Sequence, residues 1–217
     1  MSAMINQAYI YKRPDIVRLV HPSAKRVLDV GCSTGVLGGQ VKELTGAYVV
    51  GVELSETMAN EAAKYLDEVY IGDATELIVN GFSDGSKFDT IIFSDLLEHL
   101  IDPWSTLNTA TKYLDHHGVV IASIPNIRHI STLCNLVFKG YWPYQDRGIH
   151  DKTHLRFFTK KNIVELFEGA NLKLEVVKVN YRFFDKPLRV NRFARYFALP
   201  FLRNFLAYQY VVRAVRI

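Results

Sequence analysis

The stretch from residue 25 to residue 39, KRVLDVGCSTGVLGG, constrains the fold most strongly. An apolar, β-rich run reaches Asp29 and Val30, and the chain then turns through Gly31 and Gly35 into a helical pattern. A strand, a glycine turn and a helix form the opening unit of an α/β nucleotide-binding sheet. Because the spacing is Gly-x-x-x-Gly, with Ser33 between the glycines, the Gly-x-Gly-x-x-Gly motif of a dinucleotide-binding protein is absent.

Apolar runs and helical patterns continue to alternate along the chain. This order predicts parallel strands with right-handed crossovers. Two further β-rich runs, 173–180 and 208–217, extend the sheet. The predicted fold class is α/β: a Rossmann-like, seven-stranded, mostly parallel sheet with helices on both faces, plus a basic, aromatic helical insertion near the C-terminus. The first five predicted strands are residues 26–30, 48–53, 68–71, 88–93 and 119–124.

The composition narrows the class of protein. A chain of 217 residues with 49% hydrophobic residues fits one domain with a sizeable core. Cys32 and Cys134 have neither a disulfide framework nor a metal-site spacing, so we expect no metal and a reducing cytoplasm. No stretch approaches the roughly 18–20 apolar residues of a transmembrane helix, and the N-terminus has no apolar run typical of a signal peptide. We therefore expect a cytoplasmic protein.

Three acidic residues follow the first three predicted strands. Asp29, Glu53 and Asp73 fall at their carboxyl ends, where ligands bind in open α/β sheets. Glu53 lies 18 residues after Gly35, where a carboxylate can accept both ribose hydroxyls. Asp73 lies 20 residues further along, where it can meet an adenine amino group. The glycines allow the backbone to approach a ligand closely, because a Cβ would obstruct it.

At these positions the sequence resembles the class I S-adenosylmethionine-dependent methyltransferases. The resemblance covers roughly residues 10–180, and it places the last strand at 208–217. It departs from the family at Ser33, where a glycine is usual. The matching motifs are residues 27–35 (VLDVGCSTG), 50–53 (VGVE), 72–74 (GDA) and 88–94 (FDTIIFS).

The resemblance implies S-adenosyl-L-methionine as the cofactor and a role for each matching residue. The backbone of Gly31, Cys32 and Ser33 would line the methionine part, with Gly35 completing the turn and Asp29 organising the loop. Glu53 would bind the ribose. Leu54 and Ala74 would flank the adenine, Asp73 would bond its amino group, and the Ser94 carbonyl would meet the methionine ammonium.

The acceptor side is predicted from the departures from regular α/β structure. Residues 141–158 combine aromatic side chains with His, Asp and Arg. Histidine has an unperturbed pKa of about 6.5 and can take a hydroxyl proton at neutral pH. His154 or His150, with Asp151 nearby, is therefore the candidate catalytic base. The alternative is that these residues only hydrogen-bond the loop and hold its shape.

Two classes of acceptor are considered. Residues 123–129 and 141–158 resemble a bacterial methyltransferase group associated with polysaccharide and glycoconjugate synthesis, which implies a sugar or carrier-linked sugar hydroxyl. A phenol or quinone precursor, as in ubiquinone-type O-methyltransferases, is the alternative. No Asn/Asp-Pro-Pro-Tyr motif follows the fourth strand, so methylation of nucleic-acid bases is disfavoured and we expect no nucleic-acid partner.

The domain is predicted to span 1–217, with an N-terminal cap over 1–24, an acceptor-side insertion over 125–158 and a basic helical insertion over 181–207. Residues 181–217 carry a net charge of +7, whereas the rest of the chain carries −3. Aromatic residues recur at roughly helical spacing beside arginines in 184–206, which is compatible with peripheral membrane contact. A homodimer contact, closure over an anionic acceptor and simple core packing are the alternatives.

Two other functional classes remain open at this point. The first is a non-catalytic module that keeps the fold and binds the cofactor without turnover. The second is an NAD-dependent oxidoreductase, which the missing third glycine disfavours.

Overall fold

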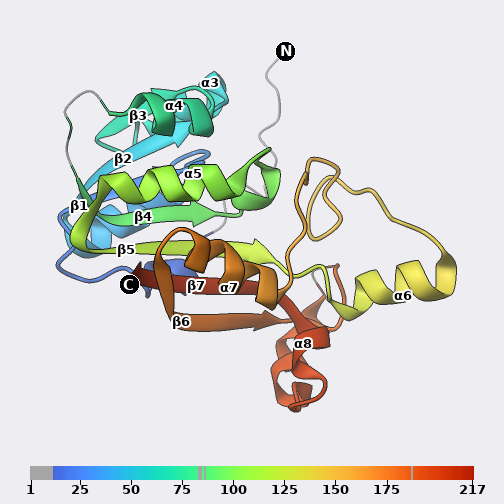
Figure 1. Ribbon diagram of the computed structural model, residues 1–217. Coiled ribbons are helices and arrows are strands. Elements are labelled where there is room, and N and C mark those ends of the chain that lie inside the picture. Colours follow the sequence, from blue (N-terminus) through green and yellow to red (C-terminus); the bar gives the residue numbers. More distant parts are fainter. Residues whose placement is uncertain (1–11, 83–84, 86, 187) are drawn as a thin grey trace.

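The computed structural model describes residues 12–82, 85, 87–186 and 188–217. Its centre is a seven-stranded sheet in the order β3-β2-β1-β4-β5-β7-β6 (Figure 1). The first five strands pair in parallel, and β7 runs antiparallel between β5 and β6. The strands are β1 (Arg26–Val30), β2 (Tyr48–Glu53), β3 (Glu68–Ile71), β4 (Phe88–Ser94), β5 (Leu114–Pro125), β6 (Leu172–Tyr181) and β7 (Ala207–Arg216). The predicted mixed sheet is confirmed.

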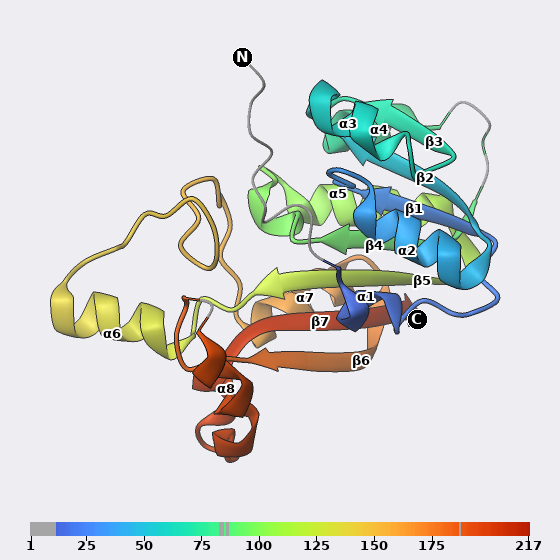
Figure 2. The ribbon, with the colours of Figure 1, turned by 180° about the vertical axis from the view of Figure 1, so that it is seen from behind.

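Helices cover both faces of this sheet, and each face has its own hydrophobic core (Figures 1 and 2). One core joins Val27 and Val49 to Ile16 and Val41, from α1 (Pro14–Val17) and α2 (Val36–Thr45). The other is built on the opposite side chains of the same strands. It is completed by α4 (Ala74–Asn80), α5 (Pro103–Ala110) and α7 (Lys160–Gly169). Strands buried on both faces explain the near-continuous apolar runs in the sequence.

Most predicted element boundaries agree with the structure within a few residues. The fifth strand differs from its predicted bounds, 119–124, because it already begins at Leu114. Leu114 pairs with Phe88, and an irregularity before Thr90 accommodates the extra length. The 3₁₀ helix η3 (Thr111–Tyr113) follows α5 and leads into this strand. The third helix, α3, spans Glu56–Ala62.

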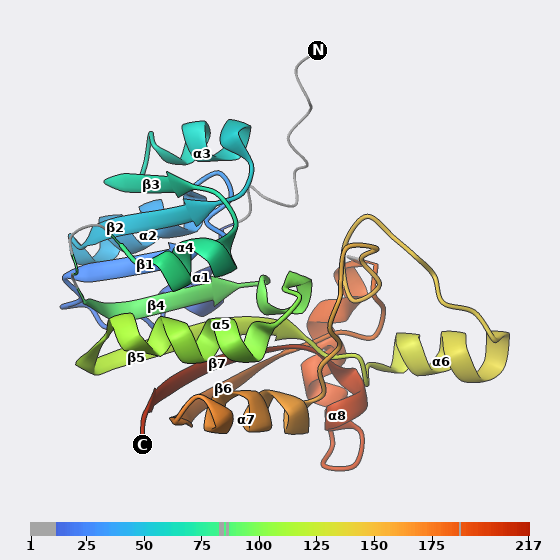
Figure 3. The same ribbon diagram turned by 45° about the horizontal axis from the view of Figure 1, so that its top comes forward.

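Two segments leave the regular α/β pattern. Residues 126–159 contain α6 (Ile130–Lys139), which projects away from the body of the molecule, followed by an irregular return to α7 (Figure 3). Residues 182–206 join β6 to β7 and contain η4 (Arg189–Phe197) and α8 (Arg203–Leu206). Among the described residues, no helix has both the length and the apolar character needed to cross a membrane.

The segment from 182 to 206 differs from the basic aromatic α-helices predicted there. η4 is a 3₁₀ helix, and only four residues after Pro200 are α-helical. Asn191 explains part of the difference, because its side chain accepts the backbone N–H groups of Phe183 and Phe184 and donates to the carbonyls of Phe184 and Lys186. Such side-chain bonds compete with a regular helix.

Candidate active site

The loop between β1 and α2 needs three residues in the left-handed region. Gly31 has φ +73°, Ser33 has φ +51° and Gly35 has φ +76°. A Cβ on Gly35 would stand 2.7 Å from the Cα of Ala62, so glycine is required there for packing as well as for backbone conformation. The loop is fixed to β2 because the N–H groups of Gly31 and Cys32 both donate to the Val52 carbonyl, at 2.8 and 3.0 Å.

Glu53, at the end of β2, joins this loop to the next one. Its Oε2 accepts the N–H of Ser33 at 2.8 Å, and its Oε1 accepts the N–H of Ser55 at 2.9 Å. Each carboxylate oxygen can accept more than one hydrogen bond, so the group can still accept two hydroxyls. Leu54, which follows it, is 70% exposed and can contact an adenine ring.

Asp73 and Ala74 lie at the start of α4. Asp73 caps this helix, since its Oδ1 accepts the N–H groups of Thr75 and Glu76 at 2.8 and 3.1 Å. Its Oδ2 makes no hydrogen bond among the described residues and is the atom that could meet an amino group. Ala74 is buried and belongs to the hydrophobic core. It can therefore shape the floor of an adenine site rather than form an exposed wall.

Two predicted cofactor residues point into the protein beneath the loop. Asp29 is 1% exposed, and burial raises its pKa from 3.8 to about 7, although the nearby N–H of Gly38 offsets part of the effect. Cys32 is also buried, and burial raises the pKa of its thiol far above the ordinary value. The Cys32 side chain packs under Gly51 in the core. Only its backbone can line a ligand.

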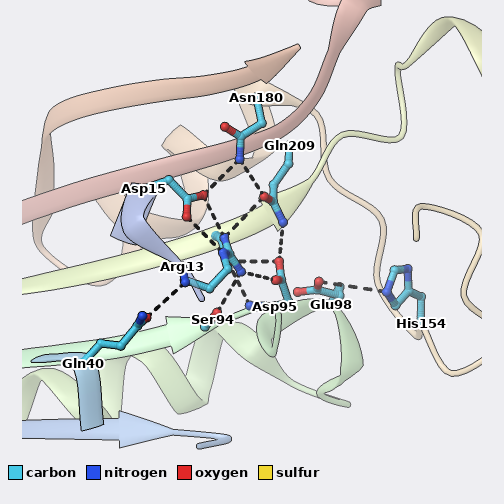
Figure 4. Close-up of polar contacts among 10 residues, drawn as sticks. Arg13, Asp15, Gln40, Ser94, Asp95, Glu98, His154, Asn180 and Gln209 are labelled. Carbon is cyan, nitrogen blue, oxygen red and sulfur yellow. Dashed lines mark hydrogen bonds and ion pairs between the residues drawn. The ribbon is translucent and has the colours of Figure 1, made fainter. Parts of the chain in front are cut away.

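Ser94 ends β4 and begins a polar network that the sequence did not predict (Figure 4). Arg13 donates to the Ser94 hydroxyl at 3.0 Å, to Asp95 at 2.5 Å and to Asp15 at 3.1 Å. Gln209 of β7 donates to Asp95 and accepts from Asn180. The network therefore links the segment before α1 to the carboxyl end of β4 and to the last two strands.

Charge pairing in this network outweighs the effect of burial. Burial alone lowers the pKa of Arg13, but Asp95 and Asp15 raise it well above its ordinary value. Burial raises the pKa of Asp15, and the hydrogen bond from Arg13 reverses that effect. Asp95 also has φ +52°, a conformation that costs on the order of 1 kcal/mol or more outside glycine. Asp95 is therefore held in place by its partners.

Glu98 and His99 follow in the short 3₁₀ helix η2 (Leu97–His99), and the fold brings His154 to them. The Glu98 carbonyl accepts the N–H groups of Leu155 and Arg156 at 2.8 and 2.9 Å, which ties the irregular segment to the end of β4. The rings of His99 and His154 meet edge to face, 4.6 Å apart. The sequence alone gave no reason to join residues more than 50 positions apart.

Burial disfavours the charged forms of both the Glu98 carboxyl and the His154 imidazole. Burial, reinforced by Asp95, raises the pKa of Glu98 well above 4.5. Burial, reinforced by His99, lowers the pKa of His154 below 6.5. Glu98 Oε1 lies 4.0 Å from His154 Nε2, but the two shifts weaken any ion pair between them (Figure 4). Glu98 Oε2 is buried without a hydrogen-bond partner in the described part of the chain.

The fold also groups three residues of types that can serve as metal ligands, although no metal was expected from the sequence. One ligand atom from each of Glu98, His99 and His154 lies within 4.8 Å of the others. Carboxylate oxygen and imidazole nitrogen are common metal ligands. The trio can thus hold a divalent cation as well as take part in proton transfer.

His150 and Asp151, the other two catalytic candidates, have structural partners. His150 is fully buried, with Nδ1 3.0 Å from Asp185 Oδ2 and Nε2 3.1 Å from the Thr132 hydroxyl. Both ring nitrogens are therefore engaged. Asp151 accepts the N–H and hydroxyl of Thr153 at 2.9 and 2.7 Å, which closes a turn. Their contacts favour the loop-holding alternative for both residues.

The aromatic residues of the same segment divide into packed and exposed side chains. Trp142 packs edge to face against His150 and Phe157, with centroids 5.0 and 5.2 Å apart. Tyr141 and Tyr144 are largely exposed. A small hollow adjoins His154 and is lined by Pro125, Ile127, Ile149, His154, Arg156, Phe157 and Phe158.

Comparisons with known proteins agree with this arrangement. A family model described as a methyltransferase domain matches residues 6–177. A ubiquinone biosynthesis O-methyltransferase of Coxiella burnetii (strain RSA 331 / Henzerling II) is 27% identical over 161 residues, which are 72% of this chain and 68% of that protein.

Solved structures share the fold. An S-adenosylmethionine-dependent methyltransferase from Mesorhizobium loti superposes with a TM-score of 0.63 at 18% identity, covering 94% of this chain and 96% of that one. An O-methyltransferase from neocarzinostatin biosynthesis, solved with S-adenosyl-L-homocysteine and 1,4-dihydroxy-2-naphthoic acid, gives a TM-score of 0.56 at 14% identity, over 93% of this chain and 52% of that one.

The glycine loop, the free acceptor capacity of Glu53 and the exposed Leu54 suit a nucleoside with a short polar tail in place of a pyrophosphate. The family model spans far more than half of the chain. The chain therefore belongs to the methyltransferase-domain family and is an S-adenosylmethionine-dependent methyltransferase.

Proposed function

We propose that this enzyme methylates a hydroxyl group on a phenolic or quinone-precursor small molecule. The observation that carries the proposal is the cluster of Glu98, His99 and His154, in which a neutral imidazole stands just beyond the end of β4. Two of the proteins described above support the acceptor class: one is named for ubiquinone biosynthesis, and the other was solved with a dihydroxynaphthoic acid.

His154 is the base in this proposal. Its Nδ1 lies 3.2 Å from the Ile149 carbonyl, which can only accept, so Nδ1 carries the proton and Nε2 keeps its lone pair. Nε2 would take the proton from the acceptor hydroxyl as its oxygen attacks. Glu98, on the side of Nε2, would then accept a hydrogen bond from the N–H of the imidazolium through a carboxyl oxygen.

The remaining residues position the reactants. When bound, the cofactor supplies a methyl group activated on a sulfonium centre. Glu53 would hold its ribose, Asp73 its adenine amino group, and the backbone of 31–33 with the Ser94 carbonyl its methionine part. The Arg13–Asp95 pair would keep the end of β4 fixed, so that base and cofactor stay aligned for an in-line displacement.

A sugar hydroxyl is the second candidate acceptor. Tyr141 and Tyr144 are exposed beside Trp142 and offer apolar faces on which a sugar ring can stack. This candidate agrees with the resemblance of residues 123–129 and 141–158 to methyltransferases of polysaccharide synthesis. The names of the relatives described above do not bear on that resemblance.

The acceptor is tested by incubating the enzyme with S-adenosylmethionine and panels of dihydroxybenzoates, free and nucleotide-linked sugars, and primary amines, followed by mass spectrometry. We expect O-methylated phenols, with product formed much more slowly by Glu53→Ala and by His154→Gln. Products only from sugars would move the acceptor to the second candidate, and N-methylated products only would reject O-methylation. Binding of S-adenosylhomocysteine without any product would favour a non-catalytic module.

Residues 184–206 are proposed to contact a membrane surface. Large apolar side chains there are exposed, among them Phe193, Phe197 and Phe201, and arginines stand between them. Sedimentation with vesicles that contain phosphatidylglycerol tests this: we expect binding that Phe197→Ser and Phe201→Ser together abolish. Equal sedimentation of this double variant would reject the contact.

A further inference from the structure

A cavity of about 240 Å³ opens at the start of α7, next to α8 and β7. It is separated from the hollow beside His154 by a short ladder, in which Asn126 pairs with Phe158 and the Ile127 N–H donates to the Phe158 carbonyl at 2.9 Å. The chain at the end of β5 therefore alternates between the two spaces: Ile127 lines the hollow beside His154, whereas Asn126 and Arg128 line the cavity. The cavity is lined by Asn126, Arg128, Thr159, Lys160, Lys161, Asn204 and Tyr210.

The charged residues of this lining are all cationic. Lys160 makes no ion pair with any described residue. Lys161 stands 3.7 Å from Glu165, but both side chains are largely exposed, and such a pair contributes little. The Arg128 guanidinium lies over the Phe205 ring at 4.6 Å and keeps its charge. The cavity therefore has a positive potential.

The first turn of α7 adds hydrogen-bond donors. The helix has ten residues, and its capping box uses the Thr159 side chain for the N–H of Asn162. The N–H groups of Lys160 and Lys161 precede any intrahelical acceptor. They point out of the helix at the positive end of its dipole, where anions are stabilised.

The hydroxyl of Tyr210 provides an independent observation on this cavity. The residue is 2% exposed and lines the cavity, yet its hydroxyl makes no hydrogen bond with any described residue. Burial raises its pKa, and although Arg128 and Arg203 act in the opposite direction, the phenol stays protonated. Asn126 differs, because its side chain is already bonded to the backbone of Asn204, Ala207 and Arg128. The Tyr210 side chain thus brings to the cavity a hydroxyl donor that no described residue uses, and a ligand bound there can accept its hydrogen bond.

We propose that this cavity binds the phosphate group of a phosphorylated small molecule. A phosphate oxygen accepts hydrogen bonds only, so it complements the Tyr210 hydroxyl, the first-turn N–H groups and the three cations. Pockets for whole drug-sized ligands measure about 300–1,000 Å³. A cavity of about 240 Å³ therefore suits one charged group better than an entire acceptor. The proposal does not depend on which hydroxyl is methylated.

Phosphate binding is measured by ³¹P NMR and calorimetry on the full chain at fixed ionic strength. The probes are inorganic phosphate, phenyl phosphate, acetate, and phosphatidylcholine vesicles with phosphatidylglycerol. We expect the two soluble phosphates to bind more tightly than acetate. Lys160→Ala with Lys161→Ala should weaken phosphate at least tenfold, and Tyr210→Phe about tenfold, because a hydrogen bond to a charged group is lost.

The matched control removes the same charge elsewhere. Lys173→Ala with Lys178→Ala, both exposed on β6, should change the phosphate Kd less than twofold. Equal weakening by the control, affinity for acetate equal to that for phosphate, or binding to vesicles alone would overturn the proposal. Binding of S-adenosylhomocysteine by each variant shows that it is folded, and it separates failure of this proposal from failure of the proposed methyl transfer.

Discussion

The cofactor half and the acceptor half of this enzyme are held together in different ways. At the ends of β1, β2 and β3, the contacts that shape the site join residues near one another in the chain. Glu53 meets Ser55 two positions away and Ser33 twenty positions away. On the acceptor side, His150 meets Asp185 across 35 positions, and Arg13 meets Gln209 across 196.

The difference explains how each half can vary. The glycine turn after β1 and the acidic residue at the end of β2 belong to one continuous stretch of chain. Such a stretch can form the same cofactor site in different proteins. The acceptor site depends on how two irregular segments, 126–159 and 182–206, pack against the rest of the domain. Substitutions in those segments should change the acceptor site and leave the cofactor site as it is. Variants in the two halves should therefore separate turnover from cofactor affinity.

The largest expected effect is on turnover, from His154→Gln. Removing a general base typically lowers the rate by about 10²–10⁴-fold. Initial rates with saturating acceptor measure it. In the wild-type enzyme the base acts only when neutral, so activity should fall as pH drops through its pKa. Because burial lowers that pKa, the acid limb should lie below pH 6.5.

His150→Gln is the matched comparison for this variant. It removes an imidazole four positions away, whose nitrogens are both engaged. We expect its acid limb to remain where the wild type has it. If His150→Gln abolished the limb and His154→Gln kept it, the assignment of the base would be reversed.

The next effect concerns Asp29, under the cofactor loop. Its pKa is about 7 in the folded protein against 3.8 otherwise, so the native state holds the proton more tightly. Its contribution to stability is complete below pH 3.8 and is lost as pH rises to about 7. The loss is on the order of 4 kcal/mol.

Urea unfolding of the cofactor-free enzyme from pH 4 to pH 8 measures this contribution. Asp29→Asn should remove most of the decline, whatever its absolute stability. A decline of equal slope in both proteins would show that another group titrates.

A smaller effect is expected on the acceptor side from Asp185→Asn. Burial raises the pKa of Asp185, but hydrogen bonds from His150 and Tyr208 outweigh it and lower the pKa below 3.8. Losing these charge-assisted bonds should cost about 1.5–3 kcal/mol of unfolding free energy. Amide exchange should quicken around residues 148–154 while the cofactor loop stays protected. Faster exchange in the cofactor loop alone would contradict the division into halves.

The smallest effect is a gain, from Ser33→Gly. Ser33 has φ +51°, so glycine should relieve strain and stabilise the enzyme by about 1 kcal/mol, partly offset by the greater freedom of the unfolded chain. The change in Tm measures this gain in stability. Gly46→Ala is the opposite control, because it places a side chain at φ +69° and should lower the Tm. A lower Tm for Ser33→Gly would show that the serine side chain contributes more than its strain costs.

The sequence predicted the sheet and the places of Gly31, Glu53 and Asp73, because strand periodicity and glycine turns are local signals. It identified His154 only as one of two candidate histidines, beside His150. Its neighbours Glu98 and His99 lie more than 50 positions earlier in the chain, and nothing in the local pattern pairs them. Arg13 gave no signal of its role, since all its network partners except Asp15 come from distant parts of the chain.

The most direct test of the account is calorimetric titration of S-adenosylhomocysteine into Glu53→Gln and His154→Gln, side by side. Loss of a charged acceptor for two ribose hydroxyls should weaken binding by Glu53→Gln about 10–100-fold. His154→Gln should bind like the wild type. Two results would contradict the separation of the cofactor site from the acceptor site. One is an unchanged affinity in Glu53→Gln, and the other is a loss of affinity in His154→Gln as large as that expected for Glu53→Gln.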